Sequence, residues 1–257
     1  MESTFLQRNC LDLQRAASSS ALTVLEHDLD ALLSQHADEQ TMQQIAVTLA
    51  DFAQCHLHDA LRALLQDEAA LRRVAERSYL HGNGFYKLVL AERDNLKLRL
   101  HLWMPGVDAE ENIHDHRWHL ASAIVTGTLK SESWGEAVSS DARLFNEYRY
   151  TARQGASPAQ LADMGSTRLQ CKHQSERTAG QCYTMAPGTL HRIVNSGNTL
   201  TSTLMCQSAP ARAWNRLLPF RAALMPDVAQ PFLGIKALRA VLVRYCDELA
   251  VPLQVAA

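Results

Sequence analysis

Residues 112–120 read NIHDHRWHL, so His114, His116 and His119 fall within six positions of an otherwise strand-like segment. Residues two apart on a strand point to the same face. We therefore expect His114 and His116 to project together, with Trp118 on the same side and His119 on the opposite face. Two imidazoles on one face can chelate a single first-row metal ion. The segment predicts a metal site that contains His114 and His116 but not His119.

The composition is that of an ordinary globular protein and excludes several functions. The chain has 257 residues, of which 47% are hydrophobic and 20% charged, with a formal net charge of −2. Lys and Arg do not cluster, so we expect no nucleic-acid partner. We find no signal-peptide pattern and no run of roughly 18 apolar residues, so we expect no membrane partner. The six cysteines form no CxxC pair. This argues against a disulfide framework or a thiolate zinc site and favours a cytoplasmic location.

The N-terminal region, residues 1–84, has helical periodicity. Apolar side chains recur at helical spacing over residues 22–33 and again over residues 42–52. Thr41 followed by Gln44 has the form of a capping box, which predicts a helix start at this point. The apolar stripes predict helices that pack on a common core.

From Phe85 the hydrophobic period changes to that of a strand. In residues 96–104, LKLRLHLWM, leucine at every second position alternates with Lys97, Arg99 and His101. This alternation is typical of a half-buried strand. Further short strand-like runs, separated by Gly and Pro turns, continue to about residue 207. Such a series predicts an antiparallel sandwich or a jelly-roll barrel.

Helical periodicity returns after Pro210, and the last clear stripe runs from Ile235 to Leu249. We therefore expect one integrated domain of the mainly β class with helical flanks. Its parts are an N-terminal helical region (1–84), a barrel (85–208) and a C-terminal segment of helices (209–257).

A third ligand is needed for a tight metal site, and a second histidine segment offers one. Residues 180–195 read GQCYTMAPGTLHRIVN. The turn at Pro187–Gly188 delivers His191 on the strand that follows.

Together, the two histidine segments resemble the two motifs of the cupins, small jelly-roll barrels whose metal ligands come from both motifs. The first motif is His-x-His, three residues, a ligand position, six residues and Gly, filled here by His114, His116, Leu120 and Gly127. The second is Gly, five residues, Pro-x-Gly, two residues, His, three residues and Asn, filled here by Gly180, Ala186-Pro187-Gly188, His191 and Asn195, with the proline one position later than in the motif.

Leu120 stands where many cupins carry a glutamate ligand. The chain therefore resembles the three-histidine branch, which includes the cysteine-dioxygenase-type thiol dioxygenases, over about residues 85–208. The resemblance implies a jelly-roll barrel with His114, His116 and His191 as ligands of Fe(II). It also implies O2 as co-substrate and oxygenation of a small anionic metabolite with a thiol, carboxylate or amino-acid-like group.

The residues that define cysteine oxidation in that family are missing, so free cysteine is not the expected substrate. The position of the family's crosslinking cysteine holds Ala121, and the position of its carboxylate-binding arginine holds Leu88. Its Ser-x-His-x-Tyr relay corresponds to Leu204, Cys206 and Ser208.

Other side chains could recognise the substrate. The aromatic candidates are Tyr86, Trp118 and Tyr183, each of which could equally belong to the core. The cationic candidates, any of which could instead be structural or solvated, are Lys87, Arg99, Arg117, Arg153 and Arg192. Strand alternation would turn Lys87 away from the face of residue 88. Cys206 could be a reactive thiol or a small buried apolar residue.

Two further functions remain open at this point. A metal-dependent cupin could act as a Lewis acid in isomerisation, decarboxylation or hydrolysis. A cupin could also bind a small molecule without catalysis, and the helical flanks could then serve a homodimer.

Overall fold

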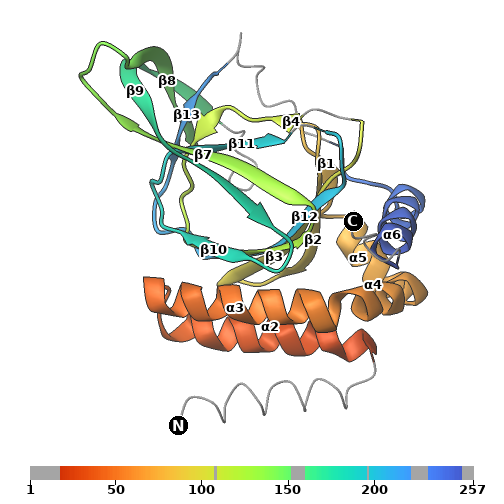
Figure 1. Cartoon of the computed structure of the whole chain (residues 1–257). Coiled ribbons are helices and arrows are strands. Elements are labelled where there is room, and N and C mark those ends of the chain that lie inside the picture. The colour runs from red at the N-terminus through yellow and green to blue at the C-terminus, as the bar shows by residue number, and fades with distance from the viewer. Residues whose placement is uncertain (1–17, 107–108, 152–159, 196, 221–230, 251–257) are drawn as a thin grey trace.

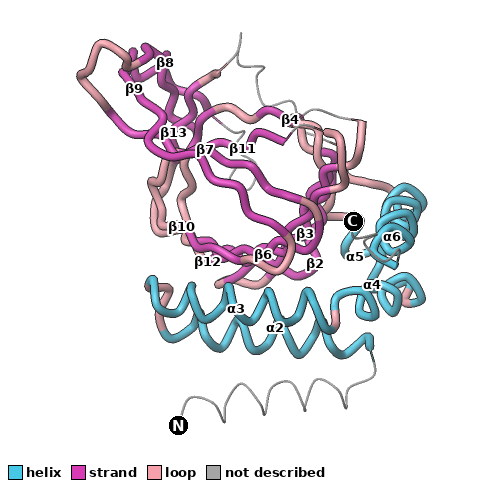
Figure 2. The backbone as a smooth tube through the Cα atoms, in the orientation of Figure 1, coloured by secondary structure: helices cyan, strands magenta, loops and turns pink. Residues whose placement is uncertain are grey.

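The structure, a computed structural model, describes residues 18–106, 109–151, 160–195, 197–220 and 231–250. In these residues the strands form a barrel, and the helices cover one side and one end of it (Figures 1 and 2). The predicted mainly β class with helical flanks is confirmed. No helix in this part of the chain has both the length and the apolar character needed to cross a membrane.

The described N-terminal helices are α2 (Ser18–Gln35), α3 (Glu39–Cys55), α4 (Leu57–Gln66) and α5 (Glu68–Ala75). The predicted apolar stripes form their buried faces. The predicted helix start at Thr41 is wrong, because α3 begins at Glu39 and Asp38 is its N-cap. The Asp38 carboxylate accepts a hydrogen bond from the backbone N of Thr41 at 2.8 Å. Asp is one of the preferred N-cap residues, and it comes first along the chain.

The first sheet lies next to the helices. Its strand order is β1 (Tyr79–Leu80), β2 (Tyr86–Glu92), β3 (Leu96–Trp103), β12 (Thr201–Ser208), β6 (Leu120–Thr126) and β10 (Cys182–Met185), all antiparallel. Helix α3 runs along the sheet and contacts β6, β10 and β12 (Figure 1).

The second sheet faces the first. Its order is β4 (Ala109–Glu110), β11 (His191–Asn195), β5 (Ile113–His114), β13 (Asn215–Leu218), β8 (Arg143–Thr151), β9 (Gln160–Thr178) and β7 (Thr128–Glu136). Strand β11 pairs with β7 as well as with β5, so this sheet curls back on itself. Two facing antiparallel sheets of this kind form the predicted jelly roll.

Strand β3 shows which side of the first sheet faces the barrel. Its alternate leucines, from Leu96 to Leu102, are at most 1% exposed and pack in one apolar cluster with the N-terminal helices and helix α6 (Ile235–Ala250). Trp103 belongs to a different apolar cluster, which includes Ile193 of the opposite sheet. The polar side of β3 therefore faces the barrel interior and not solvent. The strand is more buried than predicted, since Arg99 on its polar face is 7% exposed, although the Lys97 side chain remains 37% exposed.

Two boundaries also differ from the prediction. Strand β13 pairs with β5 and β8, so the barrel continues beyond residue 208 into a segment predicted to be helical. Strand β1 lies inside the predicted N-terminal helical region. Both strands are too short to show a period of their own. In the C-terminal segment, α6 is the one helix within the described residues.

Candidate metal centre

His114, His116 and His191 meet inside the barrel. His114 on β5 and His191 on β11 are cross-strand partners. His116 follows two residues after His114, just beyond the end of β5. The ring centroids are 4.5–5.0 Å apart, and one ligand atom from each ring lies within 4.8 Å of the others. The structure thus brings the three predicted ligands into one group that could hold a metal ion.

Hydrogen bonds orient two of the three rings. Nδ1 of His114 lies 2.9 Å from the backbone O of Asn112, and Nδ1 of His191 lies 3.0 Å from that of Thr189. A carbonyl oxygen can only accept, so each Nδ1 carries the proton and donates it. The Nε2 lone pairs are then free for a metal, the usual arrangement around a ligating histidine.

Burial also keeps the His116 and His191 rings neutral. Burial lowers the pKa of His191 to about 3, and burial together with the two neighbouring histidines holds the pKa of His116 well below its usual value. Among the described residues no carboxylate or thiol joins the group. Leu120, at the position of the cupin glutamate, is a buried residue of β6. The donor set of neutral imidazoles fits a divalent first-row metal.

Asp115, between the two histidines, is a residue whose role the sequence did not reveal. It points away from the metal group, as strand alternation predicts, and it is 0% exposed. Its Oδ1 accepts from the backbone N of Arg216 at 2.7 Å, and its Oδ2 from Nη1 of Arg212 at 2.9 Å. Asp115 therefore fastens the histidine segment to the chain around β13. The only sequence signal for this role was the position of an acidic residue between two histidines.

No protein-family model and no curated protein matches the sequence. Solved structures match about half of the chain at low similarity. An RmlC-like cupin from Shewanella frigidimarina is 16% identical, with 51% of this chain and 82% of that chain covered and a TM-score of 0.31. A cupin domain from Bordetella pertussis is 16% identical, with 49% and 93% covered and a TM-score of 0.28. A polyketide cyclase from Streptomyces resistomycificus is 10% identical, with 58% and 82% covered and a TM-score of 0.34.

The topology of the two sheets, with histidines at the two motif positions, decides the fold. This is a cupin barrel. The low similarities to solved structures say nothing of its activity, and they lend no support to the resemblance to cysteine-dioxygenase-type enzymes.

A cavity of about 490 Å³ reaches His191 from one side of the cupin barrel. Strands β7, β9 and β10 contribute most of its wall, including Tyr183, one of the predicted pocket residues. The Arg177 guanidinium lies 4.8 Å from the centre of the Tyr183 ring and donates to the hydroxyl of Ser175 at 2.5 Å. His119 also lines this cavity, although it is not part of the histidine group. The cavity is the natural approach for a small molecule.

Trp118 lies beside a candidate ligand, as predicted from its position. Its ring stacks on that of His116 with centroids 5.3 Å apart and planes at 18°. The guanidiniums of Arg99 and Arg117 lie 5.5 and 5.2 Å from the Trp118 ring. Trp118 therefore connects the histidine group with the cationic side of the barrel interior.

Lys87 lies inside the cupin barrel. It is the cross-strand partner of His101, whereas Leu88 belongs to the apolar layer between the sheet and the helices. The sequence prediction placed residue 88 on the interior face, so strand alternation put Lys87 on the outer face. Alternation holds, but the face was assigned incorrectly.

Other candidates lie away from the histidines. Tyr86 and Cys206 pack in the helix-facing layer, and burial raises the pKa of the Cys206 thiol to about 12. Arg192 forms an ion pair with Glu132 and stacks on Phe220. These contacts assign Tyr86, Cys206 and Arg192 to packing. Arg153 lies outside the described residues.

The positions that the resemblance to thiol dioxygenases singles out also lie in the helix-facing layer. Leu88, Ala121, Leu204 and Cys206 all belong to the helix-facing apolar cluster. They therefore cannot contact a molecule held by the histidines, and their identity carries no information on the substrate.

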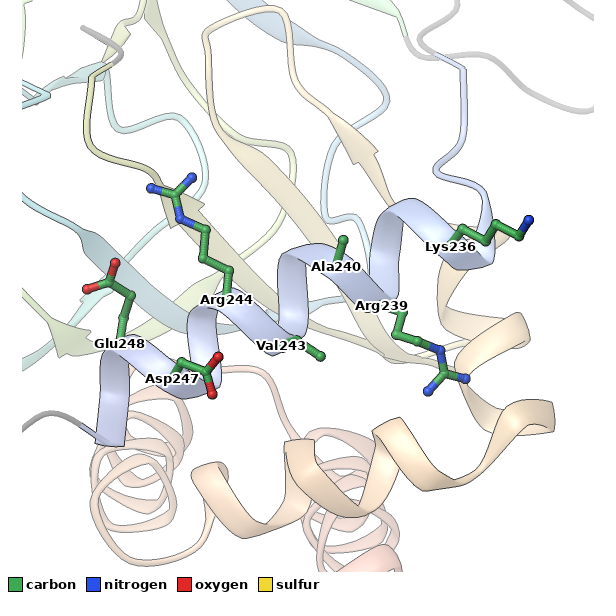
Figure 3. A pocket seen from close by; sticks show the side chains of 7 residues that line it. All are labelled: Lys236, Arg239, Ala240, Val243, Arg244, Asp247 and Glu248. Atoms are coloured by element: carbon green, nitrogen blue, oxygen red, sulfur yellow. The ribbon is translucent and has the colours of Figure 1, made fainter.

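A second hollow, of about 790 Å³, lies on the surface of α6 (Figure 3). Its lining comes from that one helix and consists largely of charged side chains around Val243, with no histidine or cysteine.

Proposed function

We propose that this chain is a mononuclear metal enzyme of the three-histidine cupin type that uses Fe(II) and O2 to oxygenate a small anionic metabolite. The observation that carries the proposal is the group of His114, His116 and His191, with two rings fixed through Nδ1 and no carboxylate among the ligand atoms.

Three neutral donors leave the charge of a divalent ion uncompensated, which favours an anionic substrate. A bound Fe(II) would supply open coordination positions for substrate and O2 and the electron that O2 activation needs. Nothing in the donor set alone selects iron, since imidazole also suits other first-row metals.

The remaining residues shape the approach to this group. The cavity beside β10 admits a small molecule to His191, with the Tyr183 ring and the Arg177 guanidinium in its wall. Trp118 covers one side of the His116 ring and limits access of water there. The Nδ1 hydrogen bonds of His114 and His191 hold both rings in the ligating orientation.

Elemental analysis of protein purified without chelators tests the metal site. Wild type is expected to hold about one metal ion per chain, and His191→Ala to lose it because a fixed ligand is removed. His119→Ala is the matched control: it removes a histidine near the same cavity and should keep the metal. Wild-type protein that takes up no metal, even after anaerobic reconstitution with Fe(II), would contradict the proposal.

Oxygen uptake then separates oxygenation from the other chemistries. The Fe(II)-loaded protein is expected to consume O2 with at least one member of a panel of thiols and small carboxylic acids, and the His191→Ala variant with none. Stoichiometric metal without O2 consumption on any panel member would instead favour Lewis-acid chemistry at the same histidines.

A further inference from the structure

Two cations that the sequence offers as substrate-recognition candidates lie on the interior face of the first sheet, the half-buried Lys87 and the buried Arg99. Arg99 on β3 is 7% exposed. Lys87 on β2 is opposite His101, and Arg99 is opposite Val89, so the two cations are diagonal neighbours on one face. Side chains in this relation lie within about 7–8 Å of each other. The barrel thus places two positive groups together in a buried setting.

Neither cation is neutralised by an acid. Within the described residues, no ion pair is formed by Arg99 or Lys87. Glu92, the acid of the same hairpin, pairs with Lys97 and acts on Arg99 only from a distance. The Lys87 ammonium lies 5.7 Å from the centre of the Tyr79 ring, which offers a cation–π contact but no negative charge. Glu111 acts on Lys87 only from a distance, and its carboxylate accepts from the backbone N of Ile193 at 3.3 Å. Buried charges normally have a partner, so this pair is unusual.

Several donors around the cations also lack hydrogen-bond partners. Nε of Arg99, Nε2 of His101 and Nε1 of Trp118 are buried and unpaired. Buried polar atoms are nearly always satisfied by protein, water or a ligand. The common requirement of Arg99 and Trp118 is an acceptor, and a carboxylate offers several acceptor sites together with the missing negative charge.

The cationic pair is linked to the histidine group through a single ring. The Trp118 ring stacks on His116 and lies 5.5 Å from the Arg99 guanidinium. A molecule that follows the Trp118 ring would reach His116 at one end and Arg99 at the other.

We infer that Arg99 and Lys87 form the binding site for a carboxylate of the substrate, whose opposite end reaches the three histidines along Trp118. The inference deepens the proposed function and rests on it for the role of the histidines. It identifies the substrate class as a small organic acid held at two points.

The electrostatics agree with this assignment. Burial lowers the pKa of Arg99 to about 10, and burial together with Arg99 holds the pKa of Lys87 well below its usual range. Both effects reflect the cost of burying positive charge without a partner. A bound carboxylate would offset that cost for both cations.

Carboxylate binding to the full-length protein tests the inference. Formate, acetate, succinate and glutarate are titrated at constant ionic strength, with tryptophan fluorescence as the readout because Trp118 lies next to the site. At least one of them should bind saturably to wild type. Arg99→Gln and Lys87→Met should each weaken that binding about tenfold or more, since a charge-assisted hydrogen bond is lost.

Lys97→Gln is the matched control. Lys97 lies two residues from Arg99 on the same strand but is paired with Glu92, so its replacement should leave the carboxylate affinity within about twofold. Far-ultraviolet circular dichroism establishes that each variant is folded. Because Arg99 and Lys87 lie on different strands, a folding defect in one variant leaves the other as the test.

Two results would overturn the inference: no saturable binding of any of the four carboxylates to wild type, or equal affinity in folded Arg99→Gln and Lys87→Met. Metal content measured on the same preparations keeps the two proposals distinguishable. Metal-loaded wild type without carboxylate binding removes the anion site and leaves the metal enzyme. Binding that persists in His191→Ala and disappears in Arg99→Gln supports the anion site whatever the metal result.

Discussion

At the scale of single residues, Asp115 shows that orientation of the histidines depends on a neighbour that cannot ligate the metal itself. Its carboxylate faces away from the histidine group and joins the backbone N of Arg216 and the Arg212 guanidinium. The ligands on either side of it, His114 and His116, sit on a strand of two residues and the loop after it. A segment with so little sheet pairing needs such an anchor to hold its geometry.

Asp115→Asn is therefore expected to weaken metal binding by about 10–100-fold, the range found for partners that orient metal ligands. The asparagine amide presents either an N–H₂ donor or a weaker, uncharged oxygen acceptor to Arg212. The free energy of unfolding should therefore fall by about 1–3 kcal/mol. A competitive chelator titration and urea unfolding measure the two effects. Glu176→Gln, which removes an exposed ion pair with Lys130, should change neither. Unaltered metal affinity in Asp115→Asn would show that the carboxylate contacts of Asp115 do not position the histidines.

Among the elements, the turn that leads from β6 in the first sheet to β7 in the second contains the glycine of the first cupin motif. Gly127 has φ +72°, and a Cβ atom there would lie 2.3 Å from the backbone O of Leu200 and 2.7 Å from the Thr201 hydroxyl oxygen. Gly180, before β10, has φ +86°, but a Cβ atom there meets nothing within 4 Å. A comparison of Gly127 with Gly180 therefore distinguishes the cost of a positive φ from the cost of steric overlap.

Gly180→Ala should lower the free energy of unfolding by about 1–2 kcal/mol, the cost of a left-handed conformation for a residue with a Cβ. Gly127→Ala should cost clearly more, because Leu200 and Thr201 must move as well. Urea unfolding of both variants measures the difference. Equal losses would mean that the approach of β12 to Gly127 is easily relaxed.

At the scale of the whole molecule, the barrel interior makes the protein sensitive to acid. Burial, followed by the neighbouring Lys87, lowers the pKa of His81 to about 3 and holds that of His101 well below its usual value. In the unfolded chain these imidazoles bind a proton near pH 6.5. Between pH 6.5 and about 3 the unfolded state therefore binds more protons, and stability falls as the pH falls.

The urea midpoint of the metal-free protein is accordingly expected to be lower at pH 5.5 than at pH 7.5. Each such histidine contributes up to about 1.4 kcal/mol per pH unit below its unfolded pKa. His101→Gln, which cannot titrate, should show a smaller decrease than wild type. A midpoint that rises or stays constant on acidification would contradict burial of these rings in the neutral form.

The features that depend on local spacing could be predicted from the residues alone. The strand and helix periods predicted the class, and the spacing of His114, His116 and His191 within the two motifs predicted a group that the structure brings together. Alternation of side chains along a strand also predicted that His119 and Asp115 lie outside that group. These inferences concern neighbours along the chain, where geometry is nearly the same in any fold.

Only the tertiary structure decided which face of each strand is inside. In β3 the leucines pack on helices and the polar face, with Arg99, lies in the barrel, contrary to the usual rule of apolar residues inward. Placing the apolar Leu88 on the interior face therefore put Lys87 on the wrong side. The rule fails because the helical layer supplies a second apolar environment outside the barrel, and one-dimensional alternation cannot distinguish the two. Pairing of the short β13 with β5, which anchors Asp115, likewise depends on contacts about a hundred residues apart along the chain.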